Sequence, residues 1–311
     1  MAWNENDIPD QTGRIALVTG ANGGLGYETA RALASKGATV IMAARNMEKA
    51  AAAESAIEKS LPDAALDVRS LDLASLGSIA EFVASVGEDY DHIDLLINNA
   101  GVMALPERKT ADDFEMQFGT NHLGHYALTS RLLPLLVTTP GSRVVTVTST
   151  ARHFGKPVDP DDPHLSEDYT PWKAYGQSKL ANLHFALGLE QRFSEAGAES
   201  QSLVAHPGLS NTDLQANTAR EGGGHASEQM ASRFGMSAAD GALPQLRAAT
   251  DPDASGGELY APRWGNFGAA VRRPLMGRSR NQGSIDTLFE VSESETGLAL
   301  DVATTLSGSR S

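Results

Sequence analysis

The stretch that decides the fold is IALVTGANGGLG, residues 15–26. It begins with a short apolar run, Ile15–Thr19, which predicts a buried strand, and its glycine-rich turn opens a predicted helix over Gly24–Ser35. Glycines here let the turn be tight, let the backbone approach a pyrophosphate, and leave the helix N-terminal N–H groups free for the anion. The alternative is a tight turn with no ligand. The strand before it and the helix after it favour a dinucleotide site.

The alternation that starts there continues along most of the chain. Short apolar runs alternate with longer Ala-rich amphipathic stretches, which is the pattern of βαβ units that feed a parallel sheet. The sequence therefore predicts a single-domain, Rossmann-type doubly wound α/β fold with a parallel sheet of about seven strands flanked by helices. The predicted strands are Ile15–Thr19, Thr39–Ala44, Ala65–Leu71, Ile93–Asn98, Arg143–Thr148, Ser202–Ala205 and Glu258–Ala261, and the predicted helices are Gly24–Ser35, Met47–Ser60, Ser75–Val86, Ala111–Leu136, Tyr175–Ala196 and Ala238–Ala249.

Two long irregular segments interrupt this rhythm, at residues 151–172 and at about residues 209–237. Ligands of open α/β sheets bind beyond the carboxyl ends of the strands, so we expect these segments to form the walls and lid of a substrate pocket. Plain surface insertions are the alternative. No linker divides the chain, so we predict one domain over residues 12–270 with a polar C-terminal extension over residues 271–311, amphipathic near Asp286–Glu295.

Composition excludes several classes of function. A formal net charge of −14 opposes nucleic acid and anionic membranes, and the absence of cysteine excludes disulfides, thiolate catalysis and cysteine-ligated metals. We expect no signal peptide, membrane anchor or bilayer span, and a cytoplasmic location. His122 and His125 have a spacing able to ligate a metal, but no third ligand is obvious nearby, so no metal site is predicted.

Two residues bear on the choice of cofactor. Arg45 follows the second predicted strand, where an acidic residue would suit the ribose 2′-hydroxyl of NAD and an arginine suits a 2′-phosphate. The alternative for Arg45 is a solvated side chain at the start of a helix. Asp72 closes the third strand and has two readings of equal weight, an acceptor for the adenine amino group or a helix cap. The sequence therefore favours NADP(H) over NAD(H).

Tyr175 and Lys179 are four residues apart, so they share one face of the predicted helix. An ammonium beside a phenol stabilises the tyrosinate and lowers the tyrosine pKa, which makes the pair a plausible general acid and base. Polar residues at the exits of other strands strengthen this interpretation, because they would meet at the same edge of the sheet. They are Asn98, Asn99, Ser149, Pro207 and Gly208.

Taken together, these motifs resemble the classical short-chain dehydrogenase/reductase superfamily over roughly residues 12 to 265. The segments Gly20–Asn22, Ala44–Asn46, Asn121–Tyr126 and Leu246–Gly257 are most similar to the branch that holds retinol dehydrogenases, the WW-containing oxidoreductase and protochlorophyllide reductase. Gly23 departs from the pattern, because some NADP enzymes of the superfamily carry a basic residue there.

The resemblance implies a role for each matched residue. Tyr175 would donate the proton, Ser149 would hold the substrate oxygen, and Lys179 would bind the nicotinamide ribose and lower the tyrosine pKa. Asn121 would hold a water in a proton relay. The implied cofactor contacts are Gly20, Asn22, Gly24, Leu25, Gly26, Arg45, Asp72, Leu73, Asn99, Ala100, Gly101, Tyr175, Lys179, Pro207, Gly208 and Thr212.

The expected function is that of an NADP(H)-dependent oxidoreductase that interconverts an apolar aldehyde or ketone with the corresponding alcohol. The expected partner is a small-molecule carbonyl or alcohol, and a homo-oligomer is compatible with the resemblance. The main alternative is an NADP(H)-binding sensor or scaffold that turns nothing over. A further alternative is that the protein is a structural partner, which binds another protein through residues 209–237.

Overall fold

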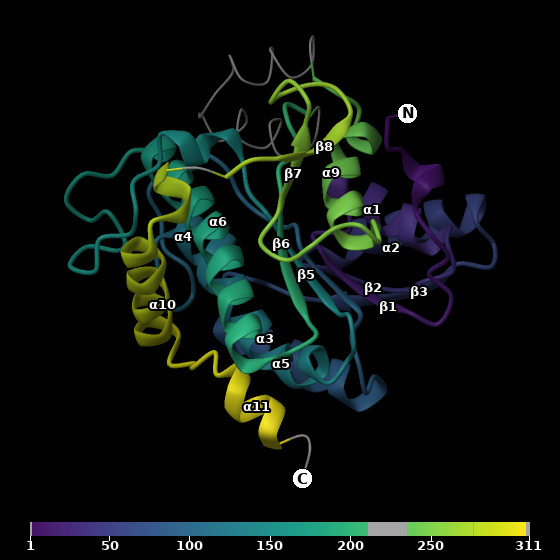
Figure 1. The fold of residues 1–311 in the computed structure, drawn as a ribbon, viewed down its shortest axis with the longest axis horizontal. Helices are drawn as coiled ribbons and strands as arrows, with labels where there is room; N and C mark the ends of the chain where they lie inside the picture. The colour runs from purple at the N-terminus through teal and green to yellow at the C-terminus, as the bar shows by residue number, and fades with distance from the viewer. Residues whose placement is uncertain (1, 211–234, 276, 309–311) are drawn as a thin grey trace.

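A computed structural model describes residues 2–210, 235–275 and 277–308. In these ranges an eight-stranded sheet forms the centre, in the order β3-β2-β1-β4-β5-β6-β7-β8, and helices cover both of its faces (Figure 1). The chain reverses direction across the sheet between β1 and β4, which is the switch point where open α/β sheets bind ligands. The strands are β1 (Ile15–Thr19), β2 (Thr39–Ala44), β3 (Ala65–Ser70), β4 (Leu95–Asn98), β5 (Arg143–Val147), β6 (Gln201–Ala205), β7 (Leu259–Pro262) and β8 (Ala270–Arg273).

The helices differ in detail from the sequence prediction. The helix expected from Ala111 begins at Met116 and contains a π-helical turn, η2, over Gly119–Leu123. Single π turns inside helices often mark functional sites, and this one holds Asn121. The helices are α1 (Gly24–Ala34), α2 (Met47–Ser60), α3 (Leu76–Asp89), α4 (Met116–Phe118), α5 (Gly124–Val137), α6 (Pro171–Ala196), α9 (Ala238–Thr250), α10 (Gln282–Thr296) and α11 (Val302–Gly308), with 3₁₀ turns η1 (Glu5–Asp7), η3 (Thr150–His153) and η4 (Gly277–Arg280).

The predicted doubly wound α/β fold is confirmed, and each predicted strand is present. The structure adds β8, which pairs antiparallel with β7 and which the sequence analysis assigned to a polar tail. This strand has only two apolar residues, and Arg272 and Arg273 at its end are exposed. Charged side chains are a common way to protect an edge strand from pairing with other chains, and they hide its strand pattern in the sequence.

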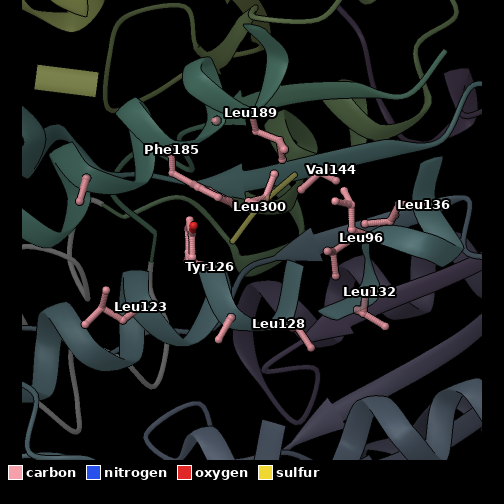
Figure 2. Packing of buried hydrophobic residues seen from close by; sticks show 14 of the residues in the cluster. Leu96, Leu123, Tyr126, Leu128, Leu132, Leu136, Val144, Phe185, Leu189 and Leu300 are labelled. Carbon is pink, nitrogen blue, oxygen red and sulfur yellow. The ribbon is translucent and has the colours of Figure 1, made fainter. Parts of the chain in front are cut away.

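Two apolar cores hold the layers together. One lies between the sheet and α3, α5 and α6, and the other lies between the sheet and α1, α2 and α9. Figure 2 shows side chains from the sheet, α5 and α6 meeting in the first core, among them Leu96, Val144, Leu132, Leu136 and Phe185. No helix in the described ranges is long and apolar enough to cross a membrane.

The C-terminal helices pack on this first core. Phe289 of α10 is buried there, and the guanidinium carbon of Arg192 in α6 lies 3.6 Å from the centroid of its ring. Figure 1 shows α10 beside α6, with α11 near the C-terminus. The predicted limit between residues 270 and 271 falls inside β8. The division into a domain and an extension stays a prediction.

Candidate active site

The turn between β1 and α1 requires glycine at several positions. Gly20 and Gly24 have φ angles of +69° and +53°, which favour glycine because it lacks a Cβ. A Cβ on Gly26 would lie 2.2 Å from the Gly20 carbonyl oxygen. The first turn of α1 has no side-chain cap, and Asn99 donates to the Thr19 carbonyl oxygen at 2.8 Å, which ties β4 to the turn. This cradle fits a pyrophosphate on the free N–H groups of α1.

A cleft of about 640 Å³ runs along the carboxyl edge of the sheet from this turn. It brings together most of the residues that the sequence analysis associated with a cofactor. These lining residues are Gly20, Asn22, Gly24, Leu25, Gly26, Arg45, Asp72, Leu73, Asn99, Ala100 and Gly101.

The cleft also has a lining residue that the sequence analysis missed. Lys49, in the first turn of α2, lines the cleft together with Arg45. The sequence signal that could have identified Lys49 is its spacing of four residues from Arg45. The pair places two cations beside the exit of β2, and Arg108 is a third cationic residue in the lining of the cleft.

The reacting centre lies at the start of α6, where Thr170 caps the helix and Pro171 occupies its first turn. Tyr175 and Lys179 are both buried, each with 4% of its surface exposed, on the side of α6 that faces β5. The Ser149 hydroxyl, at the exit of β5, lies beside the Tyr175 phenol, close enough to lower the tyrosine pKa. The Lys179 ammonium lies 5.9 Å from the tyrosine ring centroid and donates to the Val147 carbonyl oxygen at 3.3 Å.

Burial controls the protonation of this pair. It raises the pKa of Tyr175 to about 12, although the neighbouring Ser149 hydroxyl acts in the opposite direction. It also lowers the pKa of Lys179 to about 8. The sequence analysis expected Lys179 to lower the tyrosine pKa, but Lys179 is not among the causes of the tyrosine shift, which burial dominates. The phenol is therefore held protonated, as a proton donor must be.

Asn121 links the cleft to the reacting centre. Its side-chain oxygen accepts from the Val102 N–H at 2.7 Å, and its amide nitrogen donates to the Val102 carbonyl and to the Ser178 hydroxyl, each at 2.9 Å. A Cβ added to Gly101 would lie 3.0 Å from the Asn121 oxygen and 3.4 Å from the Lys179 nitrogen. Because Gly101 has no side chain, the backbone that follows β4 fits between Asn121 and Lys179.

The exit of β6 contains the predicted nicotinamide-side residues. Pro207 and Gly208 follow the strand, and Gly208 has a φ of +75°. A Cβ there would lie 2.5 Å from the Asn266 carbonyl oxygen, which also accepts from the Leu209 N–H at 3.1 Å. The β7–β8 turn therefore packs against this exit. Thr212 and most of the predicted lid lie outside the described residues.

Two of the buried histidines, His122 and His125, serve packing and hydrogen bonding. His125 bonds through Nε2 to the Thr19 hydroxyl at 2.9 Å and through Nδ1 to the Asn121 carbonyl at 2.9 Å. His122 Nε2 bonds to the Ser292 hydroxyl of α10 at 2.8 Å. Burial lowers the pKa of His122 to about 3 and that of His125 to about 4, so both are neutral at physiological pH. The described residues contain no group of three or more potential metal ligands.

An apolar wall surrounds the tyrosine. Met103, Ala104 and Ala151 form a small buried cluster with Tyr175, and the Trp172 ring packs edge-on against the tyrosine ring at 5.9 Å between centroids. Trp172 remains 40% exposed. A ligand that reaches the phenol therefore passes mainly carbon surface.

Fold and site together define a doubly wound α/β protein with a nucleotide-type cleft and, at the same edge of the sheet, a half-buried serine beside a buried tyrosine and lysine. The profile of the short chain dehydrogenase family matches residues 14–222. The chain belongs to this family, in its retinol dehydrogenase-like branch.

Several relatives define this branch. Human retinol dehydrogenase 13 is 43% identical over 211 residues, 68% of this chain and 63% of that protein, so the match spans less than two thirds of its length. Human retinol dehydrogenase 12 is 36% identical over 285 residues, 90% of this chain and 85% of that protein. The solved structure of an uncharacterized protein from Mycobacterium paratuberculosis is 38% identical, with a TM-score of 0.81 over 96% of this chain and 99% of that one.

Proposed function

We propose that the protein is an NADP(H)-dependent oxidoreductase that interconverts an apolar aldehyde or ketone with the corresponding alcohol. The observation that carries this proposal is the position of the Tyr175 phenol beside the Ser149 hydroxyl and near the Lys179 ammonium, at the edge of the sheet that also forms the cleft. The names of the retinol and polyprenol dehydrogenase relatives agree with alcohol and carbonyl chemistry on apolar compounds.

In the reduction direction, each residue of the reacting centre has a distinct task. A bound nicotinamide would supply hydride to the carbonyl carbon. The Ser149 hydroxyl holds the carbonyl oxygen, and the Tyr175 phenol donates its proton to that oxygen as negative charge develops there. Lys179 places a positive charge near the tyrosine ring and stabilises the tyrosinate that remains. Asn121 positions the Gly101–Val102 backbone beside them.

The preference for NADP(H) rests on the two cations beside the exit of β2. Arg45 and Lys49 line the cleft there, and an arginine fork can bind a 2′-phosphate through two parallel hydrogen bonds. An acidic residue, which would favour NAD(H), is absent from positions 43–46 at the end of β2.

An apolar substrate is favoured by the wall around Tyr175. Met103, Ala104, Ala151 and Trp172 present carbon surface next to the phenol. Burial of such surface on both partners favours binding of an apolar carbonyl compound.

The test compares oxidation of NADPH and NADH by the pure protein over a panel of aliphatic, aromatic, retinoid and steroid carbonyls. We expect turnover that prefers NADPH, falls by about 10³-fold or more in Tyr175→Phe, and loses its cofactor preference in Arg45→Gln. Tight NADPH binding without reduction of any carbonyl would instead favour a sensor or scaffold. Failure of both cofactors to bind would refute the proposal.

A further inference from the structure

Arg152 is a buried cation directly beside the reacting centre. It lies in η3, the 3₁₀ turn that follows Ser149, and only 7% of its surface is exposed. One guanidinium nitrogen donates to the Ser149 carbonyl oxygen at 2.9 Å. The Nε atom of Arg152 is buried and has no hydrogen-bond partner among the described residues.

Arginines in protein interiors usually face carboxylates, because burial of an unpaired charge is costly. Within the described ranges, none of the ion pairs includes Arg152. Burial lowers the pKa of Arg152 to about 10, and no carboxylate among the described residues opposes this shift. The guanidinium is still charged at neutral pH, so within the described part of the chain its positive charge is uncompensated.

His206, at the exit of β6, adds a second buried donor, which lies near the Gly265 backbone. The Gly208 N–H donates to its Nδ1 at 3.4 Å, so the neutral ring carries its proton on Nε2. That Nε2 atom is buried, with the residue only 2% exposed, and makes no hydrogen bond of normal geometry in the described part of the chain. Burial and the charge of Arg152 lower the pKa of His206 to about 3, with a smaller opposing effect from the Gly265 backbone.

We propose that Arg152 and His206 form an anion-binding subsite, and that the carbonyl substrate carries a carboxylate or another anionic group in addition to its apolar body. The proposal rests on the reaction proposed above and specifies its substrate class. The Arg152 bond to the Ser149 backbone places the subsite next to the hydroxyl assigned to the carbonyl oxygen. The apolar wall of Met103, Ala104 and Ala151 is left for the rest of the substrate.

Cofactor phosphates do not account for this charge. The cleft that fits the dinucleotide begins at the β1–α1 turn, and neither Arg152 nor His206 lines it. The proposal therefore assigns the anion that compensates Arg152 to the substrate. Charge-assisted hydrogen bonds to a buried anion are stronger than those between neutral groups, so the subsite would discriminate between charged and neutral substrates.

The experiment measures kcat/KM with NADPH for the ortho, meta and para isomers of carboxybenzaldehyde and for their methyl esters. These three isomers vary the separation of the carboxylate from the carbonyl, and each ester removes only the charge. We expect at least one acid to exceed its ester by about tenfold or more. Arg152→Met should abolish that preference, Arg152→Lys should retain part of it, and Lys156→Met, which removes an exposed cation of the same loop, should leave it unchanged.

Esters that react as well as the acids in the wild-type protein would overturn the proposal. An equal fall in kcat for acid and ester in Arg152→Met would also do so, because Arg152 would then act only by holding Ser149. Calorimetric titration of the protein with benzoate and with neutral benzamide separates the two proposals. Arg152-dependent benzoate binding without any carbonyl reduction would support the subsite and refute the proposed reaction, whereas equal binding of benzoate and benzamide would refute the subsite.

Discussion

Replacement of Lys179 by methionine should stabilise the protein while it removes activity. Burial moves the pKa of this lysine from 10.5 to about 8. At about 1.4 kcal/mol per unit, the buried charge costs about 3 kcal/mol of unfolding free energy below pH 8. The hydrogen bond to the Val147 carbonyl, 3.3 Å long, offsets about 1 kcal/mol of this cost. We therefore expect Lys179→Met to gain about 2 kcal/mol, which raises Tm by a few degrees.

The pH dependence of this gain tests its cause. The folded pKa of Lys179 lies below the unfolded value, so between the two the unfolded chain holds more protons and the stability of the wild-type protein rises with pH. The gain from Lys179→Met should be full below about pH 8 and should shrink toward pH 10.5. Thermal unfolding without cofactor, at about pH 7 and about pH 9.5, measures it.

The matched control is Lys173→Met, on the same helix, whose ammonium is partly exposed and pairs with Asp168 at 2.6 Å. This control should show no gain in Tm. A Tm for Lys179→Met that is equal to or below that of the wild-type protein at neutral pH would refute the argument, as would a gain that does not change with pH.

Two further substitutions test the cradle and the C-terminal helices. Gly26→Ala should abolish NADPH binding in a fluorescence titration, because the added Cβ would lie 2.2 Å from the Gly20 carbonyl oxygen, whereas Gly87→Ala, with nothing within 4 Å of its Cβ, should bind normally. Unimpaired binding by Gly26→Ala would contradict the assignment of the cradle. Phe289→Ala should cost about 3 kcal/mol or more in denaturant unfolding, because it empties a buried site in the core. The exposed neighbour change Glu290→Ala should cost little, and equal losses would contradict this role of α10.

The layered fold could be predicted because its signals are local. Most strands of the parallel part of the sheet are short apolar runs, β3 with its Asp67 and Arg69 being the exception, and helices follow them. Tyr175 and Lys179 could be placed on one face because four residues make about one helical turn. The glycine turn could be recognised because its glycines follow an apolar strand and open a helix, and the φ angles at Gly20 and Gly24 favour glycine.

The parts that could not be predicted depend on contacts between distant segments. β8 was missed because its exposed arginines hide the strand pattern, although its partner β7 was predicted. The π turn around Asn121 was missed because it has the same composition as an α-helix. Lys49 could be assigned to the candidate site only from the structure, which shows that it lines the cleft together with Arg45.

The amino-acid sequence alone was sufficient for the family, the doubly wound topology and the positions of the glycine turn, serine, tyrosine and lysine, because each is carried by residue type and spacing. Protonation was decided by the tertiary structure, because burial sets the pKa of Tyr175 and of Lys179. The tertiary structure also decided the environment of Arg152. The pairing of β5 with β6 brings it near His206, and no carboxylate among the described residues compensates its charge.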